Sequence, residues 1–155
     1  MFFLLTSLLV VYIIAISIPK RISWLQIWST SLFSLVMETF SDMTLDFKLN
    51  LFGYIAPGLQ WSGFLPIFLY PPVNVIFLNY YPYGKTKHIK LIYFVCWIAF
   101  CLAFEVAALS SGFFHYLRWN LWYSALCYPI LLLIVLLNYR FTDWLHHRAN
   151  KAIHV

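Results

Sequence analysis

Five stretches of mostly apolar residues, separated by short polar segments, dominate this sequence. Hydrophobic residues make up 63% of the 155 residues and charged residues only 10%, whereas roughly a quarter of a typical soluble domain is charged. This composition excludes an ordinary soluble globule and a nucleic-acid-binding protein with a dense basic surface. We predict an all-α fold, a single integral membrane domain with five transmembrane helices. The predicted spans are approximately residues 2–18, 22–40, 63–80, 91–109 and 121–137.

The first apolar stretch lacks the features of a cleaved signal peptide. No basic residue precedes it, and Pro19, Lys20 and Arg21 follow it directly. A signal peptide has its positive charge before the apolar run and a small-residue cleavage site after it. We therefore expect a retained helix whose N-terminus lies outside.

Basic residues are distributed unevenly between the segments that connect the predicted spans. The outer segments carry two of them, Lys48 and Arg118. Basic residues concentrate on the cytoplasmic side of membrane proteins. We therefore predict a multi-pass protein of the cell membrane with its N-terminus outside, its C-terminus inside and a short basic cytoplasmic tail over 138–155. The inner segments carry the other eight: Lys20, Arg21, Lys85, Lys87, Lys90, Arg140, Arg148 and Lys151.

The second predicted span carries a regular stripe of polar residues. A spacing of four residues places side chains on one slowly turning face of a helix. In hydrocarbon, a polar face must contact other protein or water. We expect this helix to cross the membrane with its stripe facing inward, and the alternative is that it lies at the membrane interface. The stripe consists of Gln26, Thr30, Ser34, Glu38 and Asp42.

The third predicted span contains residues that bend a helix and residues that link it to its neighbours. Pro66, Pro71 and Pro72 predict a kink near its middle. Asn74 and Asn79 lie in its later half. Polar side chains of membrane helices commonly hydrogen-bond across helices, for about 0.6 kcal/mol each. We expect this structural role for both asparagines.

Most acidic residues belong to the predicted outer end of the bundle. Glu38, Asp42 and Glu105 lie in the outer parts of their helices, and His115 and Arg118 lie in the last outer loop. These five residues form our candidate binding site, and metal binding there stays open. Alternative roles exist for three of them. Asp42 is expected to be solvated beyond the helix end, and His115 and Arg118 to lie at the membrane interface.

Glu105 is the most informative residue of this group. It lies in the run CWIAFCLAFEVAAL, which contains no other charge. An ionisable group at membrane depth costs several kcal/mol unless it is paired, protonated or hydrated. Two interpretations follow. Glu105 belongs to a site for a proton, a cation or a substrate head group, or it forms a buried structural hydrogen bond with Arg118, a tryptophan or a tyrosine.

The sequence contains no recognisable catalytic or cofactor-binding motif. It lacks a glycine-rich phosphate loop, a G-x-S-x-G elbow and an H-E-x-x-H zinc motif. Cys96, Cys101 and Cys127 all lie inside apolar stretches. An odd number of cysteines in such positions predicts small packing residues rather than disulfides or a zinc cluster. We therefore predict no cofactor.

Several segments of the chain resemble a group of short polytopic membrane proteins from spore-forming Firmicutes. The resemblance covers nearly the whole chain and implies a bacterial membrane protein. It implies no activity and no role for any residue. The segments are PKR after the first helix, METFSDMTLDFKLNLFGY, LNYYPY, FE with GFF, and WNLWYSALCYP.

Three functions follow from these features. We expect a non-enzymatic accessory or complex-forming membrane protein, whose partners are the lipid bilayer and copies of itself or other membrane proteins, and not nucleic acid. The second is a small proton or cation transporter or channel component that uses Glu38 and Glu105 on the same side of the bundle. The third is an intramembrane enzyme acting on a lipid or isoprenoid, which requires an apolar pocket open sideways to lipid.

Overall fold

The computed structural model describes residues 1–54 and 61–153, and helices make up 79% of it. The secondary structure is mostly helical, as the sequence predicted. The α-helices of the described residues are α1 (Phe2–Ser17), α2 (Trp24–Asp42), α3 (Tyr70–Tyr80), α4 (Lys87–Ser110) and α5 (Leu121–Ile153).

Four shorter elements accompany these helices. A π-helix, η1 (Met43–Lys48), follows α2, and a 3-10 helix, η2 (Trp61–Leu69), leads into α3. Strands β1 (Phe52–Tyr54) and β2 (Phe114–Tyr116) pair antiparallel, with Gly53 opposite His115. This strand pair joins the loop after α2 to the loop between α4 and α5.

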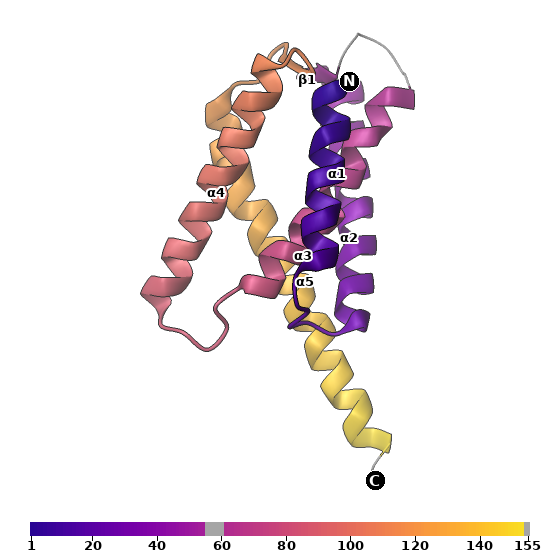
Figure 1. Ribbon diagram of the computed structural model, residues 1–155, viewed down its shortest axis with the longest axis vertical. Helices are drawn as coiled ribbons and strands as arrows, with labels where there is room; N and C mark the ends of the chain where they lie inside the picture. Colours follow the sequence, from indigo (N-terminus) through magenta and orange to yellow (C-terminus); the bar gives the residue numbers. More distant parts are fainter. Residues whose placement is uncertain (55–60, 154–155) are drawn as a thin grey trace.

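The helices run alternately up and down, and the two termini lie at opposite ends of the molecule (Figure 1). α1 and α4 meet near one end, where the ring centroids of Phe3 and Phe104 are 5.4 Å apart. Below this contact α4 leans away from α1 (Figure 1).

The polar stripe of α2 faces the interior, which confirms the prediction for its first four residues. Gln26, Thr30, Ser34 and Glu38 are at most 8% exposed. The apolar residues on the other faces of the same helix are turned outward. Trp28, Val36 and Phe40 are between 65% and 71% exposed. A helix at the surface of a soluble protein shows the opposite arrangement.

Hydrogen bonds from buried polar residues connect α2 to its neighbours. Asn74 of α3 donates from Nδ2 to Ser34 Oγ at 2.8 Å. Gln26 donates from Nε2 to Asp143 Oδ1 of α5 at 2.7 Å. Asn79 binds the connection between α1 and α2, where its Nδ2 donates to the Pro19 carbonyl oxygen at 3.0 Å. These bonds confirm the structural role expected of both asparagines.

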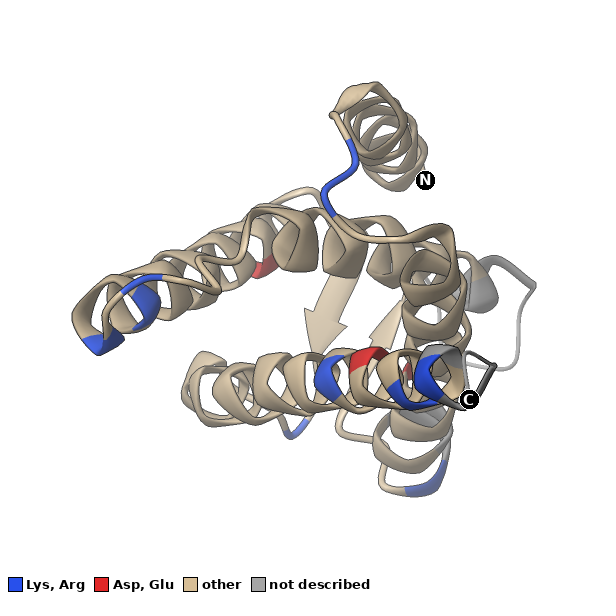
Figure 2. Ribbon diagram, turned by 90° about the horizontal axis from the view of Figure 1, so that it is seen from below, with Lys and Arg blue, Asp and Glu red and all other residues tan. Residues whose placement is uncertain are grey.

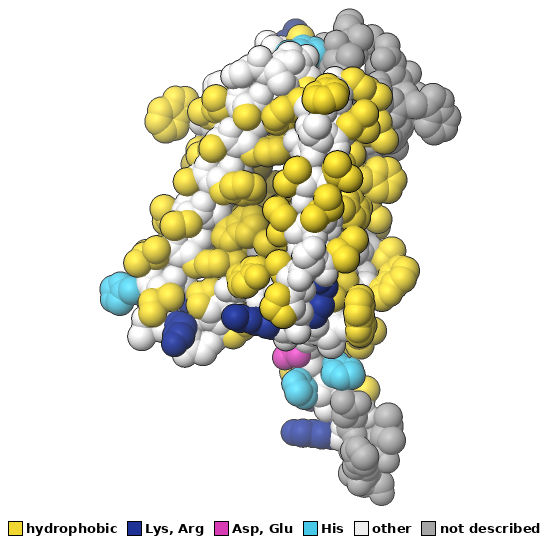
Figure 3. Space-filling view, in the orientation of Figure 1, with side chains coloured by type: hydrophobic (Ala, Val, Ile, Leu, Met, Phe, Trp, Pro, Cys, Tyr) yellow, Lys and Arg dark blue, Asp and Glu magenta, His cyan; other side chains and the backbone are white. Residues whose placement is uncertain are grey.

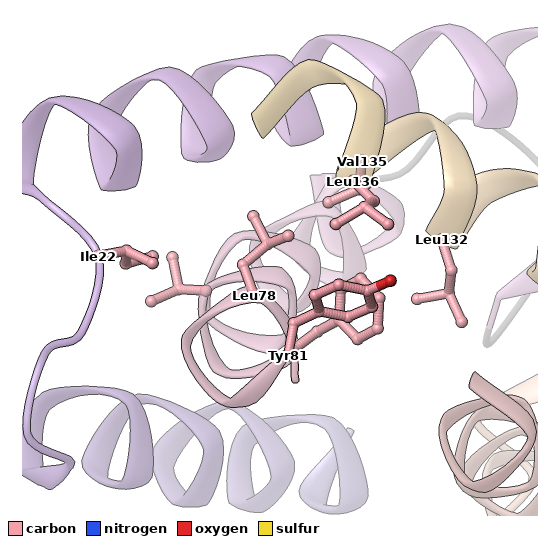
Figure 4. Close-up of a cluster of buried hydrophobic side chains, with 8 residues drawn as sticks. Ile22, Leu78, Tyr81, Leu132, Val135 and Leu136 are labelled. Carbon is pink, nitrogen blue, oxygen red and sulfur yellow. The ribbon is translucent and has the colours of Figure 1, made fainter. Parts of the chain in front are cut away.

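Two apolar clusters complete the packing. The larger one joins the end of α3 to α5 and to the start of α2, and includes Ile22, Leu78, Tyr81 and Leu132 (Figure 4). The smaller one lies near the strand pair and joins α1, η2 and α4. Its buried members are Leu4, Leu69, Ala108 and Phe113.

The structure differs from the prediction in three places. The third predicted span is a 3-10 helix as far as Leu69 and an α-helix from Tyr70, because Pro71 and Pro72 occupy the first turn of α3, where no backbone N–H is needed. α5 continues through the polar tail to Ile153. The short strand pair was not predicted at all.

Two helices of the described chain are long and apolar enough to cross a membrane. They are α4 and the part of α5 from Leu121 to Ala149. Two further apolar helical stretches, Phe2–Ser17 and Leu65–Tyr80, are shorter. These lengths and compositions are consistent with membrane association.

We predict opposite effects for two substitutions one turn apart on α2. Ser34→Ala removes the acceptor of the Asn74 amide and should lower the free energy of unfolding by about 1–3 kcal/mol. Thr30→Val should be neutral or stabilising, because Thr30 Oγ1 is buried and has no hydrogen-bond partner among the described residues. Thermal melting of the purified protein measures both. Equal destabilisation by the two changes would contradict this assignment.

We also predict that Gly53 leaves room for the His115 ring in the strand pair. A Cβ atom at this position would lie 2.8 Å from Nε2 of His115. Gly53→Ala should therefore destabilise the protein by about 1–3 kcal/mol, and adding His115→Ala should restore most of this loss. Gly84→Ala is the matched control, since nothing lies within 4 Å of its Cβ position. The prediction fails if the two alanine variants melt alike.

Candidate functional site

Two elements, β2 and α5, bring hydroxyl groups to the carboxyl group of Glu105 on α4. The residue lies near the end of α4, and the chain reverses at Gly112, whose φ of 70° suits glycine. Strand β2 then returns past Glu105 and presents Tyr116. Ser124 and Tyr128 follow on α5 with a spacing of four residues, which places them on one face of that helix.

All three hydroxyl groups donate hydrogen bonds to Glu105. Tyr116 Oη and Ser124 Oγ donate to Oε1, each at 2.6 Å, and Tyr128 Oη donates to Oε2 at 2.8 Å. Glu105 itself is only 6% exposed. This arrangement satisfies a buried carboxyl group and links α4, β2 and α5.

The loop around Tyr116 is held in place by its own contacts. The carbonyl oxygen of Leu51 accepts hydrogen bonds from the backbone N–H groups of Leu117, Arg118 and Trp119. The indole Nε1 of Trp119 donates to Ser124 Oγ at 2.8 Å. Burial and the hydrogen bond to Glu105 raise the pKa of the Tyr116 phenol, so this group remains a donor at neutral pH.

Glu38 borders two cavities of the bundle. The first, which we call the central cavity, has a volume of about 130 Å³ and is lined by residues from each of α1 to α5. Its lining is mainly apolar, with polar contributions from Ser34, Glu38, Asn74 and Tyr128. Val11 of α1 and Phe104 of α4 belong to its wall. In the space-filling view, the surface between α1 and α4 is hollowed and lined by hydrophobic side chains (Figure 3).

The second cavity lies toward the strand pair and has a volume of about 270 Å³. We call it the aromatic cavity, because half of its described lining residues are aromatic. Glu38, Tyr70, Tyr128 and Leu131 line both cavities. Glu38 is the only Asp, Glu, Lys, Arg or His among the described residues that line either one. The aromatic residues are Phe52, Tyr54, Tyr70, Phe114, Trp119 and Tyr128.

The two predicted acids lie on the same side of the bundle. Tyr128 donates to Glu105 and also lines both cavities that Glu38 borders. The side chain of Asp42, at the end of α2, lies outside the described part of the structure. The two acids therefore differ in their surroundings: hydroxyl groups hold Glu105, and Glu38 borders two cavities.

The other predicted site residues lie apart from the carboxylate of Glu105. His115 lies against Gly53 in the strand pair, and Arg118 is exposed. The described residues contain no ion pair between Arg118 and Glu105; the hydrogen bonds to Glu105 come from hydroxyl groups. Sequence reasoning did not single out Ser124 and Tyr128, although their spacing on one helix face was a usable signal.

Metal ligands do not gather at this site. Within residues 1–54 and 61–153, no group of three or more His, Cys, Asp or Glu side chains is arranged to hold a metal ion. Cys96, Cys101 and Cys127 are free thiols, which agrees with the prediction that they form no disulfide.

Comparison with known proteins identifies no relative. No protein-family model, no curated protein and no solved structure matches this chain.

We predict that Glu105 is required for the stability of the α4–α5 contact. Glu105→Leu removes the acceptor of three hydroxyl groups and should lower the free energy of unfolding by about 3–5 kcal/mol. Glu105→Gln should cost less, because its amide oxygen still accepts from Tyr116 and Ser124. Thermal melting distinguishes the two variants. Equal losses in both would show that the charge, and not the acceptor oxygen, is what matters.

Proposed function

We propose that this chain is a multi-pass protein of the cell membrane with five spans, its N-terminus outside and its C-terminus inside. The alternating direction of the helices and the outward-facing apolar side chains support this arrangement (Figure 1). Basic residues stand on the connection between α1 and α2, at the start of α4 and on the C-terminal part of α5 (Figure 2). These positions share one end of the bundle, as expected for the cytoplasmic side.

The third proposed span is also long enough to cross the hydrocarbon layer of a membrane. The combined stretch of η2 and α3 is 20 residues long, from Trp61 to Tyr80. A 3-10 helix rises about 2.0 Å per residue and an α-helix about 1.5 Å. The stretch therefore reaches roughly 34 Å, which exceeds the hydrocarbon thickness of about 30 Å.

Within this arrangement, we propose that the protein binds an amphipathic molecule with a hydrocarbon chain. The observation that carries this proposal is the central cavity, an apolar space lined by all five α-helices and hollowed between α1 and α4 (Figure 3). Ligand sites typically combine apolar walls with a few well-placed polar groups. Here the polar groups are Ser34, Glu38, Asn74 and Tyr128. A hydrocarbon chain enters such a cavity directly from the bilayer.

Binding without catalysis suits the chemistry of the two acids. The carboxylate of Glu105 already accepts three hydrogen bonds, so it serves the architecture. Glu38 borders both cavities, where it is placed to orient a bound molecule. This role corresponds to a non-enzymatic accessory protein that presents or stores its ligand.

Decanol tests the proposed function. We expect the purified protein to bind one decanol molecule, counted by titration with native mass spectrometry. Val73→Trp places an indole in the central cavity and should weaken binding at least tenfold. Val36→Trp is the matched control, because Val36 lies on the exposed face of α2. The proposal is wrong if none of decanol, decyltrimethylammonium and decyl sulfate binds. It is also wrong if the Val73→Trp variant binds decanol as tightly as the wild type does.

A second function, transport of the bound molecule, is favoured by one observation. Glu38, Tyr70, Tyr128 and Leu131 belong to the walls of both cavities, so a movement of these few side chains would connect the two. Flux of a labelled ligand into liposomes, compared between the wild type and Val73→Trp, separates transport from storage.

A further inference from the structure

The aromatic cavity has walls that suit a positively charged ligand. Phe52 packs against Phe114 at 5.3 Å and against Trp119 at 6.0 Å between ring centroids. Tyr54 packs against Phe114 at 5.4 Å. These rings come from the strand pair and the loop after it, and Tyr70 and Tyr128 add aromatic surface from α3 and α5. The face of an aromatic ring carries negative potential and attracts cations.

The charge of the aromatic cavity also favours a cationic ligand. Glu38 is buried, and no Lys, Arg or His is among the described residues that line the cavity. A carboxylate that is withdrawn from water interacts strongly with a nearby opposite charge. A cationic ligand is therefore attracted by Glu38 and by the rings together, whereas an anionic ligand is repelled.

The nature of the walls selects among cations. Divalent metal ions require several oxygen ligands, and the cavity offers one carboxylate surrounded mainly by rings and aliphatic groups. A primary ammonium group has three N–H donors that each need an acceptor, and in this lining the side-chain oxygen acceptors are Glu38, Ser41 and the hydroxyls of three tyrosines. A quaternary ammonium group has no N–H donor, and aromatic cages are its usual binding sites.

The two cavities fit the two parts of one molecule. The aromatic cavity, at about 270 Å³, is the larger, and the central cavity of about 130 Å³ adjoins it along Glu38 and Tyr128. A cavity of about 150 Å³ holds a molecule as large as benzene, so the central cavity has room for only the first carbons of a hydrocarbon chain. Resting on the proposed function, we infer that the ligand of this protein is an amphipathic quaternary ammonium compound. Its head group lies in the aromatic cavity beside Glu38, its chain begins in the central cavity, and the rest of the chain lies in the hollow between α1 and α4 (Figure 3).

Three ligands with the same chain and different head groups test this inference. The probes are decyltrimethylammonium, decanol and decyl sulfate, each titrated against the full-length protein by native mass spectrometry. We expect decyltrimethylammonium to bind at least tenfold more tightly than decanol, and decyl sulfate to bind most weakly. Equal binding of the cation and the alcohol overturns the inference and leaves the proposed function intact. Binding of none of the three overturns both.

Three variants test whether the residues of the aromatic cavity cause the preference for decyltrimethylammonium over decanol. Glu38→Gln should reduce the preference for the cation over decanol to less than threefold. Phe114→Leu removes one aromatic face of the cavity and should reduce the preference about fivefold. Phe113→Leu is the matched control, since this neighbouring phenylalanine is buried but belongs to neither cavity lining.

The preference is a ratio measured within each sample, so partial loss of folded protein does not affect it. Should Glu38→Gln fail to fold, the head-group ranking of the wild type and the comparison of Phe114→Leu with Phe113→Leu still decide the question. An unchanged preference in both Glu38→Gln and Phe114→Leu would overturn the assignment to this cavity.

Discussion

The burial of the polar stripe on α2 is the constraint on which the rest of the structure depends. A helix with polar groups inside and apolar groups outside is stable only if its neighbours supply hydrogen-bond partners. Asn74 of α3 meets Ser34, and Asp143 of α5 meets Gln26. These bonds place α2 between α3 and α5 and set the rotation of all three helices. The position of Glu38 at the cavity walls follows from the same rotation, because it continues the stripe.

The two buried acids show how surroundings assign different roles to the same side chain. Glu105 is reached by three hydroxyl donors from β2 and α5, and its carboxylate is satisfied within the protein. Glu38 borders both cavities, and the residues of α1 and α4 line only the central one. Packing thus separates an acid that links three elements from an acid at the wall of two cavities.

The sequence predicted features that repeat along one helix and missed those that join distant segments. The spacing of Thr30, Ser34 and Glu38 identified the inward face of α2, because helical periodicity is a local property. The partners of Glu105 lie 11 to 23 residues further along the chain. Their approach depends on the reversal at Gly112 and on the pairing of β2 with β1, and neither pattern has a strong local signal. The roles of Asn74 and Asn79 were predictable because a buried amide in an apolar helix needs hydrogen-bond partners from neighbouring segments.

The continuity of α5 has a mechanical consequence. Its 33 residues form a rod of roughly 50 Å, which exceeds the hydrocarbon layer by about 20 Å. The same rod carries Ser124 and Tyr128 at one end and the polar tail at the other. The polar tail and two residues of the wall shared by both cavities, Tyr128 and Leu131, are therefore parts of one helix, with Pro129 between these two residues. Because an internal proline removes one backbone hydrogen bond of a helix, Pro129 is the point at which this helix is most easily bent.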